Sequence, residues 1–184
     1  MRRLFIVFVL LVISSYLFAQ EEFIALTEGK TGTVFFPELI SSNLQTTVVE
    51  FSIDGFYLLD VNTHKGQEVI VDVPRSSRNL SAGNPDLVKL TASIRIPDQS
   101  HMIVNIIEAE YQEFYDIDIA PSKGNLSRST HPDDVPFIYG EAYDKDEFFP
   151  GQLATIDEPY IIRDCRGVAL HTHPFQYNPV TKTL

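Results

Sequence analysis

The chain has 184 residues and a mass of 20.8 kDa, which leaves room for one domain with a leader and excludes a large multidomain enzyme. Hydrophobic residues make up 44% and charged residues 21%, so the chain is expected to fold around a core. Acidic residues number 25 against 14 basic ones, a net charge of -11, which argues against general binding to nucleic-acid phosphates or anionic lipid.

The N-terminus has the pattern of a secretory signal peptide. Two arginines precede the apolar run 4–13, and the small residue Ala19 stands just ahead of polar Gln20. We therefore expect residues 1–19 to be a signal peptide cleaved between Ala19 and Gln20. The remaining 20–184 would be an exported domain, free of the membrane after cleavage. An uncleaved membrane anchor is the alternative, but the run is shorter than the roughly 20 residues that span a bilayer.

Apolar and polar residues then alternate with a period of two, which is typical of half-buried β-strands. This pattern predicts strands at 49–53, 69–73, 90–96 and 115–119. The longer apolar run 102–111 predicts a central strand covered on both faces, and 160–173 a second long strand. Only 38–45 resembles a helix.

Turn-forming pairs with Gly or Pro separate these runs at short intervals. Together they predict an all-β fold, a jelly-roll-like antiparallel β-sandwich without an internal domain boundary. Cys165 is the one cysteine in the chain, which excludes an intramolecular disulfide and a cysteine-rich zinc site. Stability must therefore come from packing.

Residues 120–136 are rich in turn formers and predict an exposed loop. The loop carries Lys123 and Arg128, an isolated basic pair in an acidic chain, suited to an acidic pocket on a partner. An exposed loop with a basic residue is also typical of a trypsin-like cleavage site. An ordinary solvated loop is the alternative interpretation.

Other residues could take part in metal binding or catalysis, but none of them belongs to a complete site. His171 and His173 share one face of a strand and could bind a metal, yet no third ligand is obvious. Cys165 with one of these histidines could suggest a nucleophile and base, but no oxyanion-hole loop is visible. The acidic cluster at 144–147 lacks the spacing of a calcium loop. We expect no metal, no cofactor and no catalytic residue in this segment.

An aromatic-rich stretch surrounds the acidic cluster and includes Phe148 and Phe149. Packing against the core is the simpler interpretation of such residues. If the stretch were instead a contact surface, it would fit an extracellular β-sandwich adhesion or ligand-binding module. That is the alternative function from another class.

The second half of the chain resembles the propeptide of gingipain-type cysteine peptidases, family C25. The resemblance rests on segments that occur in order over residues 119–184. They are Ile119-Ala120-Pro121-Ser122-Lys123-Gly124 followed by Ser127-Arg128, then Pro136-Phe137-Ile138-Tyr139-Gly140, Phe148-Phe149-Pro150-Gly151, the run from Pro159 to Gly167, and the run from Gln176 to Leu184.

The resemblance implies a β-sandwich prodomain, made N-terminal to a caspase-like catalytic domain, that acts as an intramolecular chaperone and keeps the protease latent. The partner would be the cognate peptidase domain, in cis or in trans. In such a zymogen a basic residue enters the acidic specificity pocket, a role that falls to Arg128, with Lys123 as second choice. The same loop is a processing site in the family. Phe148 and Phe149 are the further partner-contact residues that we expect.

Family propeptides continue past the equivalent of Leu184 into a further strand and then the protease, where the catalytic residues lie. Cys165, His171 and His173 therefore inherit no catalytic role. This segment is expected not to be an enzyme, whereas the full precursor would be a cysteine endopeptidase. We expect the propeptide domain to be truncated at its C-terminus, because 180–184 resembles a strand cut short.

Overall fold

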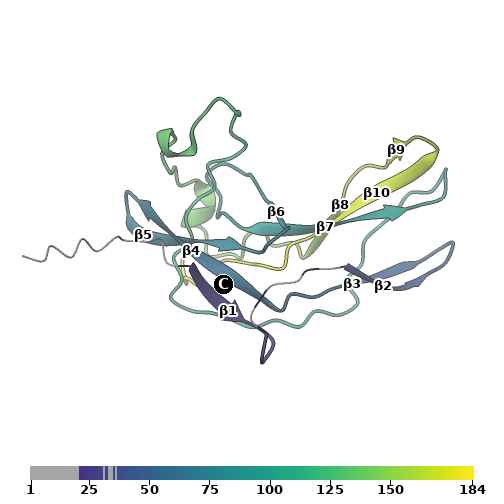
Figure 1. Ribbon diagram of the computed structural model, residues 1–184, viewed down its shortest axis with the longest axis horizontal. Helices are drawn as coiled ribbons and strands as arrows, with labels where there is room; N and C mark the ends of the chain where they lie inside the picture. The colour runs from purple at the N-terminus through teal and green to yellow at the C-terminus, as the bar shows by residue number, and fades with distance from the viewer. Residues whose placement is uncertain (1–20, 31, 33–34, 36) are drawn as a thin grey trace, which may run out of the picture.

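The computed structural model describes residues 21–30, 32, 35 and 37–184 (Figure 1). The expected signal peptide 1–19, with its cleavage site between Ala19 and Gln20, lies outside these residues. Among the residues described, no helix is both long enough and apolar enough to cross a membrane.

The described residues form two antiparallel sheets and a separate two-stranded hairpin. The first sheet has the order β1-β4-β5, with β1 at Glu21–Ala25, β4 at Gly55–Thr63 and β5 at Gly66–Asp72. The second sheet has the order β6-β7-β10-β8. Its strands are β6 at Ser77–Arg78, β7 at Val88–Arg95, β10 at Cys165–Thr172 and β8 at Ala154–Ile156. A further strand, β9 at Tyr160–Ile162, also pairs with β10. β2 at Pro37–Ser42 and β3 at Thr47–Phe51 form the hairpin, and two short 3-10 helices lie at Pro132–Asp134 and Glu141–Asp144.

Side chains from both sheets meet in one hydrophobic core. Phe56 of β4 is fully buried and packs edge-on against Phe114 and Phe175. Val88 and Leu90 of β7 belong to the same cluster. Burying one face of each sheet in a shared core is the arrangement of a β-sandwich, so the predicted all-β antiparallel fold is confirmed. Three predicted strands are confirmed as well: 49–53 falls on β3, 69–73 on β5 and 90–96 on β7.

The predicted helix at 38–45 is wrong, because this stretch forms β2 and the turn that follows it. The side-chain oxygen of Asn43 accepts hydrogen bonds from the backbone N–H groups of Gln45 and Thr46, each at 2.8 Å. This local bonding closes the turn and returns the chain as β3. β2 also has a bulge between Leu39 and Ser41, which interrupts the regular alternation of side chains in a strand.

The predicted strands at 102–111, 115–119 and 160–173 are also wrong in part or in full. Residues 102–111 contain no strand, and in 115–119 only Ile119 forms an isolated bridge. The run 160–173 is a hairpin of β9 and β10, since Arg163 turns the chain with a φ of 57°.

Candidate functional site

The basic loop 120–136 stands on a base that is held by backbone hydrogen bonds. The Gly83 N–H donates to Ser122 O (2.9 Å), and the Gly140 N–H donates to Gly83 O (2.8 Å), so Gly83 bonds both the start of the loop and the chain that leaves it. The Ser122 N–H donates to Asn84 O (2.7 Å). A Cβ on Gly140 would lie 3.0 Å from Gly83 O, which explains why this close approach needs glycine. The base is therefore a fixed frame, and in Figure 1 the green loop projects from it away from both sheets.

Lys123 connects the two sides of the loop. Its ammonium donates to the carbonyl of Pro132 (2.8 Å) and lies 4.1 Å from the centre of the Phe137 ring. Both contacts are internal, one a hydrogen bond to a charged donor and the other a cation–π contact. Lys123 is thereby committed to holding the loop together.

Arg128 lies at the tip of the loop and is exposed. The turn that carries it closes with a hydrogen bond from the Thr130 N–H to Ser127 O (2.9 Å). Over the part of the chain that the structure describes, no hydrogen bond or ion pair involves the Arg128 side chain. The carboxylate of Asp133, in the same loop, pairs with His131 at 3.5 Å. Of the two basic residues that the sequence singles out, Arg128 is the one left available to a partner.

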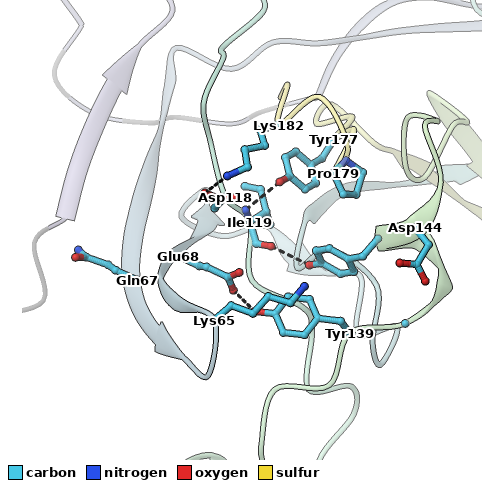
Figure 2. A pocket seen from close by; sticks show the side chains of 12 residues that line it. Lys65, Gln67, Glu68, Asp118, Ile119, Tyr139, Asp144, Tyr177, Pro179 and Lys182 are labelled. Carbon is cyan, nitrogen blue, oxygen red and sulfur yellow. Dashed lines mark hydrogen bonds and ion pairs between the residues drawn. The ribbon is translucent and has the colours of Figure 1, made fainter.

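A polar pocket of about 420 Å³ lies beside the base of the loop (Figure 2). The Tyr139 hydroxyl lies 2.5 Å from Oε2 of the buried Glu68 and 3.0 Å from the Thr63 hydroxyl. The Lys65 ammonium sits over the Tyr139 ring, 3.6 Å from its centre. Tyr143 donates to the carbonyl of Ile119 (2.8 Å). The Tyr139 contacts join the chain that leaves the loop to the β4–β5 hairpin, and the Tyr143 bond joins it to the chain that enters the loop.

The tyrosines of this pocket are held in the neutral form. Burial, followed by the hydrogen bond to Glu68, raises the pKa of Tyr139 to about 12, and burial raises the pKa of Tyr177 to about 12. Burial also raises the pKa of Tyr143 well above its ordinary value. A phenol that keeps its proton acts as a hydrogen-bond donor and not as a nucleophile or base. The three tyrosines therefore serve as hydrogen-bond donors at the base of the loop.

His171 of β10 and His173, which directly follows that strand, have different surroundings. His171 lies 2.8 Å from the Thr91 hydroxyl through Nδ1 and 2.8 Å from the Asp157 carboxylate through Nε2. His173 is buried, and burial lowers its pKa. The described residues contain no group of three His, Cys, Asp or Glu side chains placed to hold a metal. Among the described residues, the hydrogen-bond partner of the Cys165 sulfur is the Asp164 carboxylate, at 3.9 Å, and not a histidine.

The structure separates the two phenylalanines that were expected at a partner surface. Phe148 is 46% exposed, whereas Phe149 packs against the core and exchanges backbone hydrogen bonds with Tyr177, both at 2.9 Å. Of the other aromatic residues in this stretch, Tyr139 and Tyr143 make internal contacts. The sequence analysis missed the pairing of Gly83 with Gly140, because residues so far apart in the chain give no local signal.

Fold and site together define an all-β domain that presents a single basic side chain on a braced loop. The model of the C25 peptidase propeptide family (Propeptide_C25) matches residues 37–184. Because this match spans most of the chain, the chain belongs to the C25 propeptide family, and the resemblance found in the sequence is confirmed.

Curated relatives of this chain are gingipains of Porphyromonas gingivalis. Gingipain R2 is 39% identical over 149 residues, which are 79% of this chain and 20% of the relative. Lys-gingipain is 24% identical over 191 residues, covering 100% of this chain and 11% of the relative. The chain thus spans about a fifth of the length of gingipain R2.

Solved structures match the fold over most of its length. A complex of the pro- and mature domains of RgpB from Porphyromonas gingivalis superposes with a TM-score of 0.76 and 37% identity, covering 80% of this chain and 77% of that one. A structure concerning the zymogenic latency of gingipain K from the same organism has a TM-score of 0.71 at 23% identity, covering 89% and 91%. The second likeness supports the fold.

Proposed function

We propose that this chain is the N-terminal prodomain of a gingipain-like cysteine endopeptidase precursor, and that it assists folding of the peptidase and keeps it latent. The precursor would be exported after cleavage of a signal peptide between Ala19 and Gln20. The segment itself performs no catalysis. Its partner is the cognate peptidase domain, which would follow this domain in the same precursor.

The observation that carries the proposal is the contrast between the braced loop and the unpaired Arg128 at its tip. An exposed guanidinium without an internal carboxylate loses no internal ion pair when it enters an acidic pocket. A loop held at its base also loses less conformational entropy on binding than a free loop does. Arg128 is thus suited to fill the primary specificity pocket of a peptidase with Arg preference.

The same placement suits Arg128 to be the first processing site. Proteases bind their substrates as extended backbone, and an exposed loop tip is the kind of segment that they cut. Inhibition and cleavage then differ only in how firmly the loop is held after it enters the active site. We propose cleavage after Arg128 as the step that ends latency.

Inhibition of a gingipain R by residues 20–184 tests the proposal. Arg128→Ala should weaken inhibition by about 30-fold or more, which corresponds to the 2 kcal/mol of a binding hot spot. Arg163→Ala is the matched control, because Arg163 is also exposed but lies on the β9–β10 turn. Equal inhibition by the Arg128→Ala and unsubstituted domains would show that Arg128 does not occupy the specificity pocket. If the unsubstituted domain did not inhibit at all, the proposed inhibitory function would be wrong.

The alternative of an adhesion or ligand-binding module is not favoured. Its contact surface would be the aromatic stretch around the acidic cluster, but Phe149, Tyr139 and Tyr143 of that stretch make internal contacts. Phe148 remains exposed and stays the partner-contact residue that we propose for the peptidase.

A further inference from the structure

The tip of the basic loop is a turn held by hydrogen bonds to Ser127. The Thr130 N–H donates to the Ser127 carbonyl (2.9 Å). The Ser127 hydroxyl lies 3.0 Å from the Ser129 hydroxyl and accepts a hydrogen bond from the Ser129 N–H at 3.4 Å. Ser127, Arg128 and Ser129 are all exposed, so packing contributes little to this conformation. The turn 127–130 is therefore held mainly by the bonds of Ser127.

The residue types favour a turn at this place. A hydrogen bond from residue i+3 to residue i closes a β-turn, which puts Ser127 at position i and Arg128 and Ser129 at the centre. Serine suits position i because its hydroxyl can bond the backbone two residues further on. Neither central residue belongs to the described residues with a positive φ. This fits a type I turn, whose central residues have near-helical and not extended backbone angles.

The bond that a peptidase would cut after Arg128 lies in the middle of this turn. Its hydrolysis consumes one water and leaves a carboxylate on Arg128 and an amino group on Ser129. A protease binds the residues on both sides of that bond as a strand. A turn keeps the Cα atoms of residues i and i+3 within about 7 Å, whereas extended chain separates them by about 10 Å. The turn must therefore open before the bond can be cut, although the Arg128 side chain is exposed while the turn is closed.

We infer that Ser127 is a positioning residue that slows cleavage after Arg128 and so prolongs inhibition by the loop. Its role in latency rests on the proposed function. The closed turn offers the Arg128 guanidinium to a specificity pocket while it keeps the neighbouring peptide bond out of a substrate's conformation. The contacts of Lys123 and of Gly83 hold residues outside the turn. Ser127 thus controls the conformation of the cleavable bond separately from the rest of the loop.

Digestion of residues 20–184 with trypsin, followed by mass spectrometry, tests the turn without a gingipain. Ser127→Ala removes the hydroxyl and both of its contacts. Cleavage after Arg128 should become about three- to tenfold faster, because the rate follows the population of the opened turn and a lost hydrogen bond changes that population by about this factor. Ser127→Thr retains a hydroxyl and should be cut at the unsubstituted rate. Cleavage after Arg163, on the β9–β10 turn, should be equal in all three chains.

A synthetic peptide of residues 124–132 separates the turn from the preference of trypsin for particular side chains. The free peptide lacks the base and neck of the loop and samples many conformations, so Ser127→Ala should leave its cleavage rate unchanged. Acceleration of the folded chain and of the peptide by the same factor would overturn the inference. Equal cleavage of the Ser127→Ala and unsubstituted chains would also overturn it, as would a Ser127→Thr chain that is cut as fast as Ser127→Ala.

A gingipain R assay distinguishes this inference from the proposed function. Ser127→Ala retains Arg128, so it should at first inhibit as strongly as the unsubstituted chain, and its inhibition should then decay sooner. No inhibition by the unsubstituted chain would reject the proposed function, while faster trypsin cleavage of Ser127→Ala would still support the role of Ser127 in the turn. Inhibition that lasts equally long in both chains, together with equal trypsin rates, would reject the role of Ser127 and keep the proposed function.

Discussion

Lys123 donates a hydrogen bond to the carbonyl of Pro132 across the neck of the basic loop, at 2.8 Å. Its ammonium also lies over the ring of Phe137. Lys123 was the second choice for the residue that enters the specificity pocket, but in the structure it stabilises the loop that carries Arg128. The sequence places the two cations five positions apart, and the fold gives them different roles. Arg128 is exposed to a partner, and Lys123 stabilises the conformation of the loop that carries it.

Replacement of Lys123 by Met should therefore speed cleavage after Arg128 without removing Arg128. The loop loses its cross-link, and a more mobile loop adapts more readily to a protease. Limited digestion with trypsin, followed by mass spectrometry, measures the rate. Lys145→Met removes an exposed lysine outside the loop and serves as the control. Unchanged cleavage in Lys123→Met would show that the neck contact does not restrain the loop.

Replacement of Gly140 by Ala should destabilise the base of the loop. The new Cβ would lie 3.0 Å from Gly83 O and 3.3 Å from the Gly83 carbonyl carbon, so the backbone has to shift. Overpacking of this kind costs roughly 1 to 3 kcal/mol. Urea unfolding measures the loss, and Gly32→Ala, where nothing lies within 4 Å, is the control. Equal stability of both variants would mean that the base can relax at no cost.

The sequence predicted the parts of the fold that depend on local pattern. Strands with clear alternation, such as the one that became β7, were recognised because one face is buried and the other is wet. The turn-forming composition of 120–136 predicted an exposed loop, which is correct for the part around Arg128 but wrong for Ala120, Pro121 and Ser122, which are buried. The role of Arg128 came from a family resemblance, and its exposure at the loop tip is compatible with that role.

The missed elements depend on contacts that a local pattern does not record. Residues 102–111 have the apolar content of a central strand, but a strand needs a hydrogen-bonded neighbour, and none of the described residues supplies it. The helix predicted at 38–45 does not form, because the Asn43 side chain accepts hydrogen bonds from the backbone of Gln45 and Thr46 and closes a turn there. The split between Phe148 and Phe149 follows from the backbone pairing of Phe149 with Tyr177, 28 residues along the chain.

Acidification should destabilise the domain through His173. Burial, with Lys89 and His171 as further positive neighbours, lowers its folded-state pKa below the ordinary 6.5, so the unfolded chain binds the proton more readily. Stability contributed by neutral His173 is therefore present above about pH 6.5 and is lost as the pH falls toward the lowered value. Urea unfolding at pH 7.5 and 5.5 measures the loss.

His173→Phe keeps a ring of similar size without a titrating group, so it should reduce the difference in stability between the two pH values. His101→Gln removes an exposed histidine and should leave the difference unchanged. If His173→Phe retained the full difference, the pH dependence would have to come from other groups.

Replacement of Tyr139 by Phe should destabilise the chain through Glu68. The phenol lies 2.5 Å from the Glu68 carboxylate, which is only 8% exposed, and its loss leaves a buried acceptor without that donor. Such a group costs roughly 1 to 3 kcal/mol, and more when it is charged. Tyr111→Phe removes a hydroxyl from a residue that is 82% exposed, and it should cost almost nothing.

A double-mutant cycle with Glu68→Gln isolates the pair. Because the amide carries no charge, Tyr139→Phe should cost less in the Glu68→Gln background than in the unsubstituted chain. Urea unfolding gives the four free energies. Additive effects would mean that the phenol and the carboxylate are not coupled, and that the cost of Tyr139→Phe comes from the hydrogen bond between the phenol and the Thr63 hydroxyl.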